Sequence, residues 1–312
     1  MNIKYLKTGA LAAIMMLLGT GTYLYAGDYY GADEIEYAGT VLENGAGMGF
    51  VVPQHTADKL GITCISDLND HAGEFGNRII GVDSGAGIMR LAKKAVGDYG
   101  LNFDLVESSE AGMLSELRKK YDAGEDIIVT LWDPHWAFGA YDLVYLEDDP
   151  HESFGTAESI ESWVRNGLLD EDPDLAGILE RYSYDLEDFN SLLMHIRNSP
   201  KDVSEAVEDW LALNPDMRDA WIGDVEKADR GRIRIGLVNW ACAIGTSNVL
   251  KHLLEEVGYT VEIVPSETGA MYTGLAYGST DVITTAWLPL THEEYMDRYG
   301  PRPQTGGPSS EE

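Results

Sequence analysis

The sequence predicts an α/β protein with two lobes, each built on a mixed, mainly parallel sheet flanked by helices. The first observation behind this prediction is an internal duplication. One copy runs from Gly81 to Trp132 and the other from Gly236 to Trp287, a separation of 51 residues in both. The second observation is that short β-rich runs alternate with helical patterns in each copy, as they do in parallel sheets. Two such units in one chain predict two lobes with a cleft between them.

Each copy follows the order strand, turn, helix, strand, helix, strand. The first helix of each copy carries one apolar stripe and stops at a glycine, Gly97 or Gly100 in the first copy and Gly258 in the second. The stripe residues are Ile88, Leu91, Ala92, Ala95 and Val96 in the first copy and Val249, Leu250, Leu253, Leu254 and Val257 in the second. Segments 106–113 and 264–271 are again alike. The two copies are therefore expected to fold alike.

The order of the segments predicts where the lobes begin and end. Residues 28–77 and 232–300 are expected to form one discontinuous lobe, and residues 78–147 the other. This grouping would place both chain ends, near Asp28 and Gly300, on the same lobe.

The remaining segments have other predicted roles. Residues 148–231 are more helical and acidic, and they are expected to cross back and pack on the lobes. Residues 301–312 are expected to be a disordered tail. Residues 1–26 combine two lysines, an apolar stretch and a small-residue end, and they predict a secretory signal peptide. Trp163, Trp210 and Trp221 fall on helix-like patterns within 148–231 and are expected in the core.

The leader and the cysteines indicate the compartment. No other stretch is long and apolar enough to span a bilayer. The two cysteines, Cys64 and Cys242, lie far from the leader, so no cysteine is placed for lipid attachment. The sequence therefore predicts a free periplasmic protein, and a sensor that keeps residues 1–26 as an anchor is the alternative. Whether the two cysteines form a disulfide stays open.

The charge excludes some partners. The net charge is −31, and such a surface repels nucleic-acid phosphates and anionic lipid headgroups. A saline habitat, where salt screens the self-repulsion, and an ordinary acidic exported protein both fit this value. The seven histidines form no pattern of metal ligands, and neither a phosphate loop nor a nucleophile motif occurs. We therefore expect no nucleic-acid partner, no metal and no cofactor.

Three of the seven tryptophans each follow a β-rich run: Trp132, Trp240 and Trp287. Ligands of α/β sheets bind at the carboxyl ends of strands, so these three rings could converge on one small molecule. Their faces suit a quaternary ammonium, which is held by cation–π attraction and donates no hydrogen bonds. Core packing is the usual role of a single tryptophan after a strand, and both roles stay open on this observation alone.

A glycine-rich turn, residues 83–88, stands in the first copy where the second has Asn239 and Trp240. A turn of this kind, between a strand and a helix, offers free backbone N–H groups that suit an anion. A tight turn that needs glycine only for steric reasons is the alternative. An anion site and aromatic faces together predict a small zwitterion with a carboxylate at one end and a trimethylammonium at the other.

Several segments resemble the glycine betaine/proline betaine substrate-binding proteins of osmoregulatory ABC importers. They are IIGVDSGAGIMRLAKKAVGDYGL, TLWDPHWAF, IGLVNW, TSNVLKHLLEEVGY, TTAWLPLTHEEY and MGFVVPQHTADKLGITCISDL, and the resemblance covers most of residues 39–300. It implies the fold of a type II periplasmic binding protein, with ligand between two lobes. It also implies delivery of the ligand to a membrane permease and its ATPase. We expect a monomer that is not an enzyme.

The resemblance also implies the site. The ammonium group would lie among Trp132, Trp240 and Trp287. The carboxylate would be met by the backbone N–H groups of Gly87 and Ile88 and by the side chain of His292.

Two features depart from the family pattern. Asp133 stands where a threonine is expected, and residues 241–243 replace a more acidic stretch, so a different betaine could be preferred. The segment GFVVPQHTADKLGIT also comes first in this chain, and not between the copies. Choline, carnitine and a sulfonium analogue are alternative ligands. An enzyme on the same fold is the alternative of another class, and only His292 and Asp133 could supply its acid or base.

Overall fold

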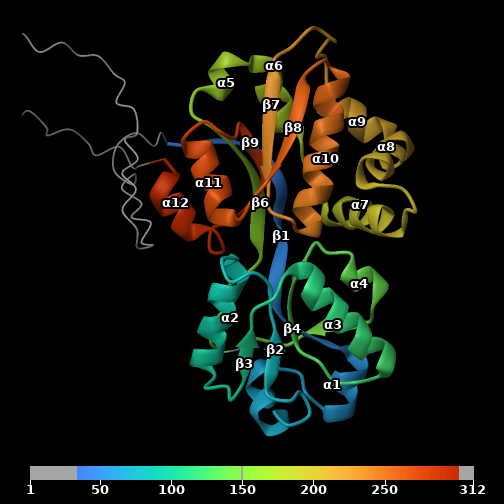
Figure 1. Cartoon of the computed structure of the whole chain (residues 1–312), viewed down its shortest axis with the longest axis vertical. Coiled ribbons are helices and arrows are strands. Elements are labelled where there is room, and N and C mark those ends of the chain that lie inside the picture. Colours follow the sequence, from blue (N-terminus) through green and yellow to red (C-terminus); the bar gives the residue numbers. More distant parts are fainter. Residues whose placement is uncertain (1–33, 149, 302–312) are drawn as a thin grey trace, which may run out of the picture. The chain divides into compact units, whose positions relative to one another are not determined.

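The computed structural model describes residues 34–148 and 150–301, which belong to one compact unit (Figure 1). The predicted signal peptide, Asp28 and all but the first residue of the predicted tail lie outside the described residues. Within the described part, no helix is both long and apolar enough to cross a membrane.

A mixed sheet of nine strands runs through this unit in the order β3-β2-β4-β1-β6-β9-β7-β8, with β5 also paired to β1. Its central strand, β1 (Glu36–Pro53), runs from one lobe into the other (Figure 1). The first part of β1 pairs antiparallel with β6 (Glu158–Val164), and its last part pairs antiparallel with β4 (Val129–Asp133) and β5 (Leu143–Tyr145). These pairings define a larger lobe, residues 34–46 and 157–301, and a smaller lobe, residues 47–148 and 150–156.

The smaller lobe holds the first copy of the duplication. β2 (Arg78–Ile80) pairs in parallel with β3 (Asp104–Val106) and with β4, and α2 (Gly87–Asp98) and α3 (Glu110–Ala123) connect these strands. The predicted stripe of α2 faces the core, because four of its five residues are buried and Val96 packs against them. The other elements of this lobe are α1 (Gln54–Leu60), the 3-10 helix η1 (Ile65–His71) and α4 (Ala137–Ala140).

The larger lobe holds the second copy. β7 (Arg232–Leu237) pairs in parallel with β8 (Thr260–Pro265) and β9 (Val282–Leu288). Two helices connect these strands and a third follows: α10 (Ala241–Glu256), α11 (Thr268–Ala276) and α12 (Glu293–Tyr299). The strand order β8-β7-β9 repeats the order β3-β2-β4, so the predicted duplication is confirmed.

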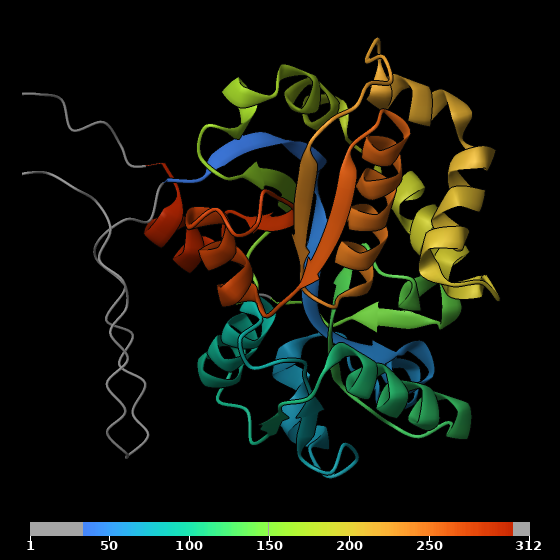
Figure 2. The same cartoon turned by 45° about the horizontal axis from the view of Figure 1, so that its top comes forward.

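The segment between the copies packs mainly on the larger lobe. Its helices α7 and α8 contact α10, and α6 contacts β1 (Figure 2). One interpretation of this segment is wrong: Trp163 lies in strand β6 and not in a helix, because this stretch pairs with β1 on one side and with β9 on the other. All three predicted core tryptophans of the segment are buried. Its helices are α5 (Leu168–Glu171), α6 (Pro173–Arg181), α7 (Leu186–Asn198), α8 (Val203–Leu213) and α9 (Pro215–Ile222).

The expected grouping of residues 28–77 with 232–300 is wrong for residues 47–77. Residues Gly47–Val51 form ladder hydrogen bonds with β4, and the backbone N–H of Ile65 donates to Glu147, so this stretch belongs to the smaller lobe. The physical reason is the length of β1, which satisfies its backbone groups on β6 at one end and on β4 at the other. The two ends of the described chain meet on the larger lobe, where Ile35 N–H donates to the Tyr299 carbonyl at 2.9 Å. Both cysteines are free thiols.

Candidate functional site

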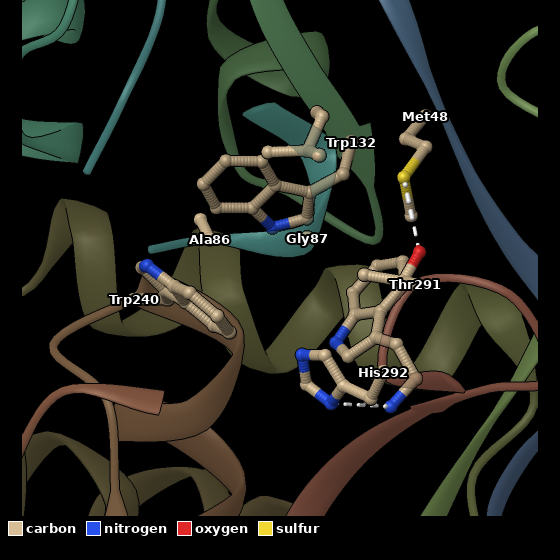
Figure 3. A pocket seen from close by; sticks show the side chains of 9 residues that line it. Met48, Ala86, Gly87, Trp132, Trp240, Thr291 and His292 are labelled. Carbon is tan, nitrogen blue, oxygen red and sulfur yellow. Dashed lines mark hydrogen bonds between the residues drawn. The ribbon is translucent and has the colours of Figure 1, made fainter. Parts of the chain in front are cut away.

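A pocket lies where the two lobes meet, and its free volume is about 20 Å³ (Figure 3). All six residues predicted from the sequence line it. The full lining is Met48, Ala86, Gly87, Ile88, Trp132, Trp240, Trp287, Thr291 and His292. This free volume is far below that of an open ligand pocket, so the two lobes lie close together on the site in this structure.

The sheet places the three tryptophans at this pocket. Trp132 lies near the end of β4 and Trp287 near the end of β9, and Trp240 is the N-cap residue of α10 directly after β7. The smaller lobe therefore contributes one indole and the larger lobe two. The rings of Trp132 and Trp240 face each other across the lobes, with centroids 6.1 Å apart and planes at 58°.

The three indole rings that line the pocket are buried. Trp132, Trp240 and Trp287 are between 3% and 6% exposed. The indole nitrogens of Trp132 and Trp240 are buried without a hydrogen-bond partner. Such a set of electron-rich faces attracts a desolvated cation that makes no hydrogen bonds.

His292 is a neutral hydrogen-bond donor at the other side of the pocket. Its Nδ1 accepts the backbone N–H of Trp287 at 3.2 Å and is 3.0 Å from the hydroxyl of Tyr272, so the ring proton sits on Nε2. Burial, with the nearby charge of Arg90 as a smaller cause, lowers the pKa of His292 to about 3. Nε2 is buried, lacks a partner and is turned towards the space beside Trp240 (Figure 3).

The start of α2 adds donors near His292. Ala86, the N-cap residue, makes no side-chain cap, and the N–H groups of Gly87 and Ile88 in the first turn have no acceptor within the helix. The partial positive charge of a helix N-terminus favours an anion at this place. Gly87 also allows the close approach of the lobes, because a Cβ there would overlap the carbonyl oxygen of Thr291.

A buried carboxylate holds the loop that carries His292. Glu158, at the start of β6, accepts the N–H of Leu290 at 2.5 Å, the N–H of Thr291 at 2.9 Å and the hydroxyl of Thr291. The same hydroxyl lies 3.3 Å from the sulfur of Met48. Sequence reasoning missed Met48, Ala86, Thr291 and Glu158. The two that matter most, Met48 and Glu158, act from segments far from the repeated motifs, and no local pattern marks them.

Asp133 does not line the pocket. Its carboxylate accepts the side-chain amide of Asn190 at 3.1 Å, and burial raises the pKa of this carboxyl. His292 is thus the one titratable side chain in the lining.

Comparison with known proteins agrees with this geometry. A family model described as the substrate binding domain of an ABC-type glycine betaine transport system matches residues 1–213 and 231–310. The glycine betaine/carnitine transport binding protein of Listeria monocytogenes is 36% identical over 234 residues, which are 74% of this chain and 77% of that protein.

Several solved structures of binding proteins are also similar to this chain. The closed lactococcal OpuAC with glycine betaine matches with a TM-score of 0.54 and 32% identity, over 61% of this chain and 71% of that one. The ProX protein of Borrelia burgdorferi matches with a TM-score of 0.54 and 33% identity over the same shares. A choline-binding protein in complex with choline matches with a TM-score of 0.55 and 26% identity, over 70% of this chain and 73% of that one. The expected fold of a two-lobed periplasmic binding protein is confirmed.

Proposed function

Because the chain belongs to the family of substrate-binding domains of ABC-type glycine betaine transport systems, we propose that its pocket captures glycine betaine between three indoles and a set of neutral donors. The trimethylammonium group lies among Trp132, Trp240 and Trp287. The carboxylate accepts hydrogen bonds from Nε2 of His292 and from the N–H groups of Gly87 and Ile88.

One observation supports this proposal above the others. The pocket is lined by three indole rings and by an uncharged N–H donor, Nε2 of His292, that has no hydrogen-bond partner. A betaine offers the indoles a trimethylammonium group and the His292 donor a charged carboxylate, whereas choline offers this donor only a neutral hydroxyl, which makes the weaker hydrogen bond. This favours a betaine over choline for this chain, although a similar structure holds choline.

The wider role follows from the family. We propose that the protein is exported by residues 1–26, acts as a monomer outside the cytoplasm, and hands its ligand to a membrane permease and its ATPase without chemical change. The acidic surface would leave the protein free of membrane lipids until it meets that permease.

Calorimetry tests the proposal. The protein without residues 1–26 is titrated with glycine betaine, proline betaine, carnitine and choline, and the ligand is recovered and identified by NMR. We expect one betaine per protein, bound more tightly than choline and recovered intact. Choline binding as tight as betaine binding, or no betaine binding, would contradict the proposal. N-terminal sequencing of the exported protein distinguishes a cleaved leader from an anchor.

A further inference from the structure

The carboxylate of Glu110 joins the two lobes behind the tryptophans. Glu110 is the first residue of α3 in the smaller lobe and is buried. Its two oxygens lie 3.2 and 3.1 Å from the backbone N–H of Ala241, the first residue of α10 in the larger lobe. Helix α10 has no side-chain cap of its own, so a carboxylate from the other lobe takes the place of one.

His135 fixes the direction of this carboxylate. Nδ1 of His135 accepts the backbone N–H of Ala137 at 3.0 Å, so the ring proton is on Nε2. Nε2 then donates to Glu110 over 3.3 Å. The imidazole is completely buried and is held from both sides, so Glu110 is aimed at α10 and cannot turn to solvent without breaking this bond.

The two partners of Glu110, His135 and Ala241, both adjoin tryptophans of the pocket. His135 packs edge-on against Trp132, with ring centroids 5.3 Å apart and planes at 89°. Ala241 directly follows Trp240 in the backbone. One carboxylate therefore connects a residue packed on Trp132 with the neighbour of Trp240, which are the two indoles that face each other across the lobes.

Two other contacts between the lobes lack these properties, although Asn190 of the larger lobe also donates to the carboxylate of Asp133 in the smaller lobe. Arg90 donates to the carbonyl of Leu290, and the guanidinium of Arg197 lies 4.7 Å from the ring centre of Trp136. The Arg90 bond is exposed and the Arg197 contact is not a hydrogen bond, so water competes with both. The bonds of Glu110 to Ala241 are partly buried and charge-assisted, and breaking such bonds costs more free energy than breaking exposed ones.

We propose that Glu110 is a closing latch, a positioning residue that locks α10 onto the smaller lobe and thereby sets the spacing of Trp132 and Trp240. The inference rests on the proposed function for its ligand. Since the latch forms only when the lobes have met, it stabilises the closed state and slows ligand release. It adds little to the first encounter, in which ligand enters the open protein.

The experiment measures release and closure in matched variants. Glu110→Ala and Glu110→Gln are compared with Glu116→Ala, which changes a partly exposed glutamate of the same helix that is paired with Arg78 within the smaller lobe. Spin labels are placed at the exposed positions Lys119 and Glu205, one on each lobe, in a Cys64→Ser background. Burial, with the charge of Glu110 as a second cause, raises the pKa of Cys242 to about 12, so that thiol does not compete for the label.

We expect Glu110→Ala to release glycine betaine about ten- to hundredfold faster, with an association rate within about twofold of the parent. The release rate of Glu110→Gln should lie between those of the parent and of Glu110→Ala, because the amide oxygen can accept one hydrogen bond but carries no charge. Glu116→Ala should match the parent. A release rate for Glu110→Ala within about twofold of the parent would overturn the latch.

The ligand-free label distances separate the two proposals. Failure of the parent protein to bind glycine betaine contradicts the proposed function and not the latch. In that case the distances between the spin labels test the latch without ligand. Glu110→Ala should shift the population towards longer distances between the lobes, and an unchanged distance distribution overturns the latch.

Discussion

Helices α2 and α10 are the matching first helices of the two copies, and both begin where the lobes meet. Neither has an N-cap side chain that bonds to its first turn. The N-terminus of α10 is filled by the protein's own carboxylate, that of Glu110, whereas the N-terminus of α2 opens into the pocket. On the two proposals made above, a helix start that favours an anion serves in one copy to bind ligand and in the other to hold the lobes together.

The same division appears at the residues before these helices. Trp240 is the N-cap residue of α10 and provides an aromatic face, whereas Ala86 is the N-cap residue of α2 and leaves the backbone accessible. The strands that end the copies remain alike, because β4 and β9 both carry a tryptophan at the pocket. The proposed sites for the ammonium and carboxylate groups thus differ between the copies at the residues before these helices, whereas the tryptophans of β4 and β9 are common to both copies.

The largest effect is expected from the aromatic end. Trp132→Ala, Trp240→Ala and Trp287→Ala should each weaken glycine betaine binding by about 1–3 kcal/mol, from lost cation–π attraction and lost packing. The triple variant should show no measurable binding by calorimetry. Trp210→Ala is the control: this buried tryptophan lies far from the pocket lining, so the change should lower thermal stability and leave the affinity of the folded protein unchanged. A triple variant that binds like the parent would refute the aromatic site.

The anion end is tested by a comparison of two ligands. His292→Ala should weaken glycine betaine binding by about 1.5–3 kcal/mol, because a hydrogen bond to a charged group is lost. Choline, which has no carboxylate, should lose less. Calorimetry with both ligands measures the difference, and equal losses would mean that His292 only supports the structure.

The N-terminus of α2, which opens into the pocket, is tested by a substitution that adds one methyl group. Gly87→Ala places a Cβ against the carbonyl of Thr291, so the lobes cannot close fully and affinity should fall by about 1–3 kcal/mol. Gly97→Ala is the matched control in the same helix, where a Cβ would meet no atom. Its affinity should be unchanged. If both variants bind alike, the close approach at Gly87 is not needed for binding.

The smallest effect concerns pH. Because the pKa of His292 is lowered to about 3 in the folded protein, the ring stays neutral and betaine affinity should be constant from about pH 5 to 8. The free energy of unfolding, in contrast, should depend on pH. The unfolded chain takes up a proton near pH 6.5 and the folded protein does not, so the contribution of His292 to the free energy of unfolding decreases as pH falls from about 6.5 towards 3. Calorimetry and urea unfolding across pH test these two statements, and a change of affinity centred near pH 6.5 would contradict the neutral donor.

Much of the site could be predicted because its residues follow strands. Trp132 and Trp287 end matching strands of the duplication, and parallel strands bring their carboxyl ends together whatever the loops do. Glu110 and Glu158 could not be found in this way. Each is an isolated acidic residue whose partners are backbone N–H groups far away in the sequence, and no spacing marks such a pair.

The lobe assignment of residues 47–77 shows a second limit. The two halves of the long strand β1 pair with different neighbours, and nothing in the sequence of β1 itself tells which neighbour each half takes. The grouping of segments was therefore wrong, although the elements within each copy were right. Met48 was missed for the same reason, since it lies where β1 passes from one lobe to the other.

A crystal structure of the protein soaked with glycine betaine would show directly how the ligand lies in the pocket. We expect the trimethylammonium group among Trp132, Trp240 and Trp287, and the carboxylate within hydrogen-bond distance of the N–H groups of Gly87 and Ile88 and of Nε2 of His292. A betaine bound in the reverse direction, or at another place on the protein, would contradict this expectation.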